Sequence, residues 1–215
     1  MILTYEGHSF FTLALESGPV IAFDPYGDFY AYPKRAVRAD VCLISHHHHD
    51  HDGVASLLPG AQFIDRPGRY RPLEGVTVLG VPVWHDEKQG ALRGPNTFFV
   101  VEAEGMRLGH AGDLGHLLER ETLRKIGPLD VVMMPVGGYY TIDAETAAEN
   151  VRRLGAAVAI PMHYRTVYDP EMPIAELEAY LRLTDAENQQ MPLLRLTKGD
   201  MDQRPSVITM QIAKG

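Results

Sequence analysis

The sequence lacks several features that would point to whole classes of protein. It has a single cysteine, Cys42, so no disulfide can form within the chain, which fits a reducing compartment. No apolar run approaches the roughly 18 residues of a membrane-spanning helix. The first residues, MILTYEGHSFF, begin with strand-like alternation and lack the basic start and apolar middle of a signal peptide. We therefore predict a cytoplasmic protein with no membrane partner.

Positive charge is also scarce. The 215 residues include 20 Lys and Arg against 28 Asp and Glu, which gives a formal net charge of −8. Nucleic acids and anionic membranes are bound by basic surfaces, so this balance argues against both as broad partners, although it allows a local basic pocket. The apolar content of 45% and charged content of 22% are ordinary for a globular protein, and we predict one domain over residues 1–215.

Histidine, in contrast, is concentrated in one place. Five of the ten histidines stand in the stretch Ser45–Gly53, SHHHHDHDG. A purification tag would lie at a terminus, whereas this run is internal and follows DVCLI, an apolar run typical of a buried strand. A solvated, histidine-rich loop is the plain alternative. Because ligand sites in layered α/β proteins collect at the carboxyl ends of strands, the position favours a metal site.

Alternation along an extended segment predicts which of these side chains share a face. His46 and His48 point the same way, and Asp50 and His51 follow at the turn, where they can reach a second ion. Four such groups in six residues would be costly to crowd together without a cation. The two histidines expected to face outward are His47 and His49.

Three further candidates each follow a strand-like run elsewhere in the chain. His85 ends VTVLGVPVWH, Asp113 ends MRLGHAGD, and His163 ends AVAIPMH. A single histidine after a strand is more often structural than a ligand. Together with the histidine loop, however, the three predict a site for two divalent metal ions, because a carboxylate such as Asp113 can bridge cations about 3.5–4 Å apart. Imidazole and carboxylate donors suit Zn²⁺ best, with Mn²⁺ or iron as alternatives.

The order of these residues resembles the metallo-β-lactamase superfamily. The motifs FDP at residues 23–25, GHSFF, HAGDLGH, PVGGYYTI and IPMHYRT are similar to a small bacterial and archaeal branch of ascorbate-6-phosphate lactonase-like and zinc-dependent hydrolase proteins. The resemblance covers nearly the whole chain, most clearly residues 2–166. It implies an α/β fold, the αββα sandwich, with two mixed sheets, helices outside and the metals at one edge between the sheets.

The resemblance also implies roles for individual residues. Asp24 would support the histidine loop, and the reaction would be hydrolysis of a small ester, lactone or phosphoester by a metal-bound hydroxide that Asp50 orients. The ligands of the first metal would be His46, His48 and His85, those of the second Asp50, His51 and His163, and the bridging ligand Asp113.

Other polar residues also have candidate roles. His110 stands three residues before Asp113, and it either orients a ligand or is a buried structural histidine. The resemblance implies that the first turn lies near the metals, so His8 in GHSFF presents the same choice. Tyr140 and Thr141, after the glycines of VGGYYTI, either donate hydrogen bonds to substrate or form a tight turn. Residues placed where they could meet an anionic small-molecule substrate are Arg93, Asn96 and Arg165.

Three other functions compete with a binuclear hydrolase. Some relatives with this fold are iron-dependent redox enzymes or dioxygenases. The identity of the bound metal would distinguish this function from hydrolysis. A nuclease is disfavoured because the chain is short and acidic and has no basic, aromatic-interleaved patch. A non-enzymatic metal-storage protein is disfavoured by the full ligand set. The resemblance also implies a homo-oligomer, since relatives without extra domains often complete the pocket with a neighbouring chain.

Overall fold

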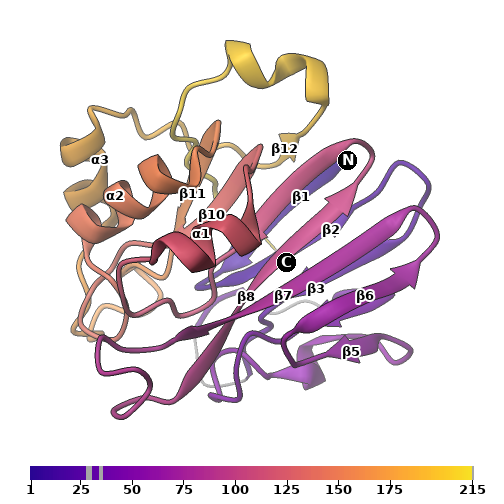
Figure 1. The fold of residues 1–215 in the computed structure, drawn as a ribbon, viewed down its shortest axis with the longest axis horizontal. Coiled ribbons are helices and arrows are strands. Elements are labelled where there is room, and N and C mark those ends of the chain that lie inside the picture. Colours follow the sequence, from indigo (N-terminus) through magenta and orange to yellow (C-terminus); the bar gives the residue numbers. More distant parts are fainter. Residues whose placement is uncertain (28–30, 34–35, 215) are drawn as a thin grey trace.

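Two six-stranded sheets lie face to face in the computed structural model, which describes residues 1–27, 31–33 and 36–214 (Figure 1). The first sheet has the order β12-β1-β2-β3-β4-β5, and the second β11-β10-β9-β8-β7-β6. The strands of the first are β1 (Ile2–Gly7), β2 (Phe10–Ala14), β3 (Val20–Phe23), β4 (Val41–Leu43), β5 (Gln62–Ile64) and β12 (Leu194–Arg195). Those of the second are β6 (Gly68–Leu73), β7 (Val76–Trp84), β8 (Pro95–Ala103), β9 (Met106–His110), β10 (Val131–Pro135) and β11 (Val158–Met162).

Both sheets are mixed, as the sequence predicts. In the first, β1, β2 and β3 are antiparallel neighbours, and β3, β4 and β5 run parallel. In the second, β6 to β9 are antiparallel and β9, β10 and β11 run parallel. The parallel strands matter for function because their carboxyl ends, and the polar loops that follow them, meet at one edge of the sandwich.

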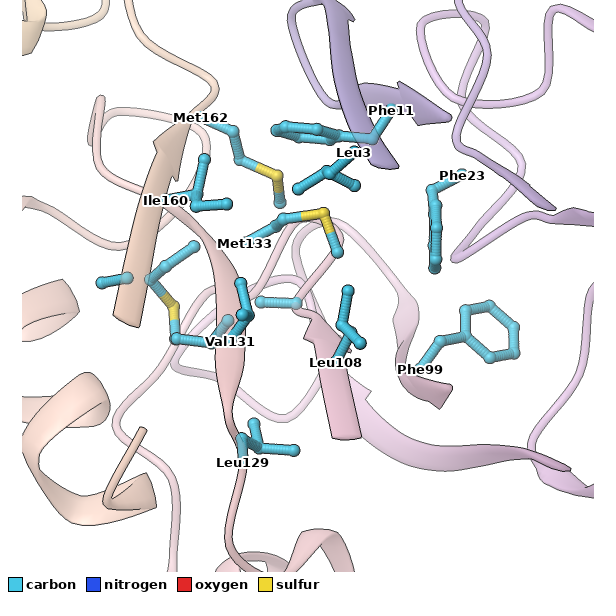
Figure 2. Packing of buried hydrophobic residues seen from close by; sticks show 14 of the residues in the cluster. Leu3, Phe11, Phe23, Phe99, Leu108, Leu129, Val131, Met133, Ile160 and Met162 are labelled. Carbon is cyan, nitrogen blue, oxygen red and sulfur yellow. The ribbon is translucent and has the colours of Figure 1, made fainter. Parts of the chain in front are cut away.

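The core lies between the sheets. Figure 2 shows Leu3, Phe11 and Phe23 of the first sheet opposite Phe99 and Met133 of the second. All five side chains are fully buried, and each contributes roughly 1.5–3 kcal/mol by leaving water. This packing fixes the register of each strand, because a slip by one residue would turn the apolar side chains away from the core.

The helices are α1 (Arg120–Ile126), α2 (Ala144–Leu154) and α3 (Leu177–Thr184), with short 3₁₀ turns at η1 (Val54–Ser56) and η2 (Lys198–Gln203). Helices α1 and α2 contact β7 and β10 of the second sheet, and α3 packs on α2 (Figure 1). Helix α2 begins and ends at residues typical of helix termini: the Asp143 carboxylate accepts from the Thr146 amide at 2.9 Å, and Gly155 ends the helix in the left-handed conformation. The αββα fold class is confirmed.

Two segments are less regular than their apolar sequences suggest. The segment GVASLL makes only the single 3₁₀ turn η1, and Leu57, which ends that turn, packs with Tyr32 and Val37 over the outer face of the first sheet. The strand-like run SVITMQI makes only isolated bridges, because it crosses from Ala159 at the edge of one sheet to Tyr5 in the other. No helix among the described residues is long and apolar enough to cross a membrane.

Candidate metal centre

The predicted metal ligands meet where strands of both sheets end at one edge. The loop 45–53 follows β4, His85 follows β7, Asp113 follows β9 and His163 follows β11. Residues more than a hundred positions apart in the chain are therefore neighbours in space.

Asp113 lies at the centre of this cluster. Its Oδ2 is 3.1 Å from Nε2 of His85 and 3.3 Å from Nε2 of His163. Its Oδ1 is 3.1 Å from Nε2 of His51, and Oδ2 is 3.9 Å from Nε2 of His46. One buried carboxylate thus faces imidazoles of both predicted ligand sets, which is the arrangement required of a bridging ligand.

Two groups of donors around Asp113 match the two predicted ligand sets, and a third group, Asp24 with His46 and His51, connects them. In each group the donor atoms lie within 4.8 Å of one another. The first group is His46, His48 and His85, and the second is Asp50, His51 and His163, joined by His8. The structure therefore places His8, whose role the sequence left undecided, beside the second ligand set.

The donor set fits divalent cations. Among the described residues, the buried Nε2 of His46 has no hydrogen-bond partner, and the buried Nε2 of His51 and Oδ1 of Asp113 face each other at 3.1 Å without the geometry of a hydrogen bond. Burying such atoms without a partner costs free energy, and a cation would satisfy them. Burial also lowers the pKa of His46 well below its ordinary value and, to a lesser degree, that of His48. Both imidazoles are therefore neutral, as metal ligands must be.

Asp24 holds the histidine loop from behind. Its Oδ2 is 2.8 Å from Nδ1 of His51 and accepts from the Ser45 hydroxyl at 2.5 Å, while its Oδ1 accepts from the Ser45 amide at 2.7 Å. The Ser45 hydroxyl also lies 2.9 Å from Nδ1 of His46. These contacts orient two imidazoles so that each turns its Nε2 toward Asp113. The placement agrees with the supporting role expected for the FDP motif.

Negative charge converges on His51. Burial lowers its pKa, but the carboxylates of Asp113, Asp24 and Asp50 outweigh burial and raise the pKa of His51 well above its ordinary value. Three carboxylates this close repel one another unless a cation lies between them. The field of the centre is thus one that attracts divalent cations.

Comparisons with known proteins agree with this geometry. Residues 2–163 match the family model described as Beta-lactamase superfamily domain. The chain belongs to this superfamily. A "UPF0173 metal-dependent hydrolase" of Thermococcus onnurineus is 32% identical over 198 residues, which cover 78% of this chain and 88% of the relative. One from Pelotomaculum thermopropionicum is 31% identical over 196 residues, covering 77% and 85%. The chain is thus a member of the metal-dependent hydrolases of the metallo-β-lactamase superfamily.

A solved structure shows the same likeness in three dimensions. A candidate zinc-dependent hydrolase of the metallo-β-lactamase superfamily from Thermotoga maritima superimposes with a TM-score of 0.80 at 35% identity, and the match covers 98% of both chains. The two-sheet architecture of this hydrolase is therefore that of its superfamily.

The remaining histidines of the hydrolase divide into buried and exposed ones. His47 and His49 are exposed, and His47 pairs with Asp52 and Asp65 on the surface. His110 is buried behind the ligands: its Nε2 lies 2.9 Å from the Ser9 carbonyl, and its Nδ1 accepts from the Gly112 amide at 3.2 Å. Because backbone groups occupy both ring nitrogens, this placement favours a positioning role for His110 over contact with substrate.

His8 contacts the second ligand set directly. Its Nε2 lies 3.2 Å from Oδ2 of Asp50, its ring centre is 4.2 Å from that of His163, and its carbonyl accepts from the His163 amide at 3.0 Å. Burial, followed by the neighbouring His163, lowers the pKa of His8 to about 4, so the ring is neutral. Of the two roles open for His8 from the sequence, the contact favours orienting Asp50, one of the predicted ligands.

Other predicted residues lie at various distances from the cavity over the metal ligands. This cavity has a volume of about 720 Å³ and is lined in part by Asp50, Asp113, Arg93 and Tyr140. Asn96 is buried outside the lining, donates to the Ala111 carbonyl at 2.8 Å and accepts from the Asp113 amide at 3.3 Å, so it positions the loop of Asp113 rather than an anion. Two residues outside this cavity lining are Thr141 and Arg165.

Asp86 is a supporting residue that the sequence patterns did not single out. Its buried carboxylate accepts from the backbone amides of residues 88, 90, 92 and 93, at 2.7 to 3.0 Å, and so holds the loop that follows His85. An aspartate at the start of a polar, glycine-bearing loop is a known turn signal, because its short side chain can accept from backbone amides ahead of it. The signal was present in DEKQGALRG but pointed to loop structure rather than to chemistry.

Proposed function

We propose that this protein is a binuclear hydrolase of a small ester, lactone or phosphoester, with two divalent metal ions, Zn²⁺ by preference, as cofactors. The observation that supports it best is the pair of donor groups that share the central carboxylate of Asp113. Metals at these positions would lower the pKa of a water molecule and polarise the bond to be cleaved.

The ligand residues divide the work of the site. In the proposed arrangement His46, His48 and His85 hold one ion, Asp50, His51 and His163 hold the other, and Asp113 keeps the two together. Burial would raise the pKa of Asp50, but the neighbouring His51 and His8 lower it below its ordinary value, so the carboxylate is ionised at neutral pH. Since Asp50 lines the cavity, it can also accept a hydrogen bond from the attacking water and orient it.

Tyr140 is the residue of this cavity best suited to donate a hydrogen bond to the substrate. Its side chain is 36% exposed and lines the same cavity as Asp50 and Asp113. Its phenol hydroxyl is a hydrogen-bond donor that can reach into the cavity toward the oxygen that gains negative charge as the bond breaks.

Two adjacent histidines provide a matched test of the ligand assignment. His46 is buried with Nε2 turned toward Asp113, whereas the side chain of His47 is 59% exposed and pairs with surface carboxylates. We expect elemental mass spectrometry of the untagged protein to find about two zinc or manganese ions per chain. The variant His46→Ala should lose metal, and His47→Ala should retain it. Activity is then screened on lactones, aryl esters and phosphoesters.

Other outcomes would change the assignment. A single iron ion per chain would favour the redox or dioxygenase alternative. Equal metal loss in both variants, or no bound metal after gentle purification and metal addition, would contradict a metal centre at these residues.

A further inference from the structure

The cavity over the metal ligands offers a largely apolar wall to whatever enters it. Beyond the ligands, this wall is formed by Tyr140, Tyr168, Met172, Pro170 and Pro173. The volume of about 720 Å³ falls within the range of about 300–1,000 Å³ usual for small-molecule sites. Side chains of this kind bury an apolar or aromatic body and provide few partners for a densely hydroxylated one.

One cationic side chain, Arg93, stands in this lining, and it is held in place. Its Nη2 donates to the Tyr139 carbonyl at 2.9 Å, and its Cζ lies 5.9 Å from the centre of the Tyr140 ring, within cation–π range. No carboxylate among the described residues forms an ion pair with Arg93. By contrast, Arg165 lines a neighbouring cavity and is neutralised by Glu176 at 2.9 Å. The charge of Arg93 is therefore available to a ligand.

The loop that carries Arg93 is itself fixed. It begins immediately after the predicted ligand His85, and the Asp86 carboxylate accepts from the Arg93 amide at 2.8 Å as well as from three earlier amides of the loop. A guanidinium on a preorganised loop loses little further freedom when it binds an anion, so more of the interaction appears as affinity.

Acidic residues of the cavity do not cancel this charge. Asp50 and Asp113 belong to the proposed metal centre, where cations would offset them. Asp169 is hydrogen-bonded to Tyr32, and its pKa is raised, chiefly by burial. Glu171 is exposed. Within the part of the chain that the structure describes, Arg93 is thus a positive group at the apolar wall that has no ion-pair partner.

We propose that Arg93 binds a carboxylate, phosphate or sulfonate group of the substrate, and that the cavity selects compounds combining an apolar body with one such anionic group. The inference rests on the proposed hydrolytic function and names the substrate class of the same site. Arg93 would act in recognition and not on the reacting bond.

Binding without turnover tests the inference first, with a matched pair of dyes. The dye 8-anilinonaphthalene-1-sulfonate has an apolar body and one anionic group, and N-phenyl-1-naphthylamine has the same body without the sulfonate. We expect Arg93→Met in the metal-loaded protein to weaken binding of the sulfonate about tenfold or more, with a change of less than about twofold for the neutral dye. The sulfonate affinity of Arg93→Lys should lie between those of wild type and Arg93→Met, because lysine keeps the charge but loses the planar guanidinium that can donate two parallel hydrogen bonds. The control Arg66→Met alters an exposed arginine outside the cavity lining and should behave like wild type.

Hydrolysis tests the same residue with a second readout. The substrates are the 4-nitrophenyl monoester of glutaric acid, with a free carboxylate, and the neutral 4-nitrophenyl valerate of similar size. Wild type should favour the anionic ester in kcat/KM by about tenfold, and Arg93→Met should bring the ratio close to one.

The two readouts separate this inference from the proposed function. Arg93-dependent binding of the sulfonate dye without turnover of any ester, lactone or phosphoester would support the anion site and count against the hydrolase proposal. Equal sulfonate affinity in wild type and Arg93→Met, or an unchanged ratio for the two esters, would overturn the anion site whether or not the protein is a hydrolase.

Discussion

Replacing Asp86 with alanine tests how the loop after His85 is held. The carboxylate is 3% exposed and accepts four backbone hydrogen bonds, at 2.7, 3.0, 3.0 and 2.8 Å. A hydrogen bond to a charged group contributes about 1.5–3 kcal/mol net, but the four donors share one carboxylate, and water can reach the exposed loop once it loosens. We therefore expect Asp86→Ala to lower the free energy of unfolding by about 2–4 kcal/mol.

Urea and thermal unfolding at a fixed zinc concentration would measure this loss, since bound metal contributes to apparent stability. For a chain of this size about 1 kcal/mol corresponds to roughly 2–4 °C in Tm, so the expected decrease is about 4–16 °C. Asp86→Asn keeps one acceptor oxygen and should lose about half as much. Glu87→Ala, an exposed neighbour, is the control. A free energy of unfolding for Asp86→Ala within about 0.5 kcal/mol of wild type would refute the reasoning.

The difference in stability between wild type and Asp86→Asn should depend on pH. Burial would raise the pKa of Asp86, but the backbone amides of Arg93, Lys88, Leu92 and Gly90 hold it below its ordinary value. A group whose pKa is lower in the folded state stabilises fully above its unfolded pKa of about 3.9, and this contribution is lost as pH falls through the folded value. The stability advantage of wild type over Asp86→Asn should therefore be constant near neutral pH and shrink below about pH 4.

Two further substitutions probe the metal centre. His8→Ala removes the contact with Asp50 and should weaken the second metal ion about 10–100-fold in a chelator-competition titration, and unchanged affinity would exclude the orienting role. In Gly115→Ala the new Cβ would lie 2.2 Å from the His85 carbonyl carbon, which should cost about 2 kcal/mol or more of stability and reduce metal content. Gly199→Ala meets nothing within 4 Å and is its control, so comparable losses in both would show that the close approach to His85 is unimportant.

The parts of the molecule that could be predicted are those written in local patterns. Helix α2 follows from its apolar periodicity between the cap Asp143 and the terminal Gly155. The grouping of the predicted ligands could be foreseen for a similar reason. Each of His85 and His163 directly follows an apolar run, and carboxyl ends of strands in a layered α/β fold meet at one edge.

The remaining contacts depend on tertiary structure that no short pattern records. His8 reaches Asp50, 42 positions away, only because the turn between β1 and β2 packs against the histidine loop, with His8 in the left-handed region at φ 53°. Asn96 looks like a loop-end residue in the sequence, yet it is buried and holds the loop of Asp113 by two hydrogen bonds. The weak run SVITMQI has strand propensity, but its partners lie in two different sheets, and propensity cannot show this.

The loop after His85 connects the proposed metal centre with the proposed anion site. Next to the predicted metal ligand His85, Asp86 accepts hydrogen bonds from the loop backbone, and the eighth residue after His85, Arg93, lies beside Tyr140 over the same cavity. Removing the Arg93 side chain leaves the backbone bonds to Asp86 in place, so selectivity for anions should be lost while metal content is kept. Removing the Asp86 carboxylate releases the loop at both ends, so metal content and anion selectivity should fall together. The two variants should differ in this way only if the Asp86 carboxylate supports both the metal centre and the anion site. If the two sites were merely adjacent, removing that carboxylate would not lower metal content and anion selectivity together.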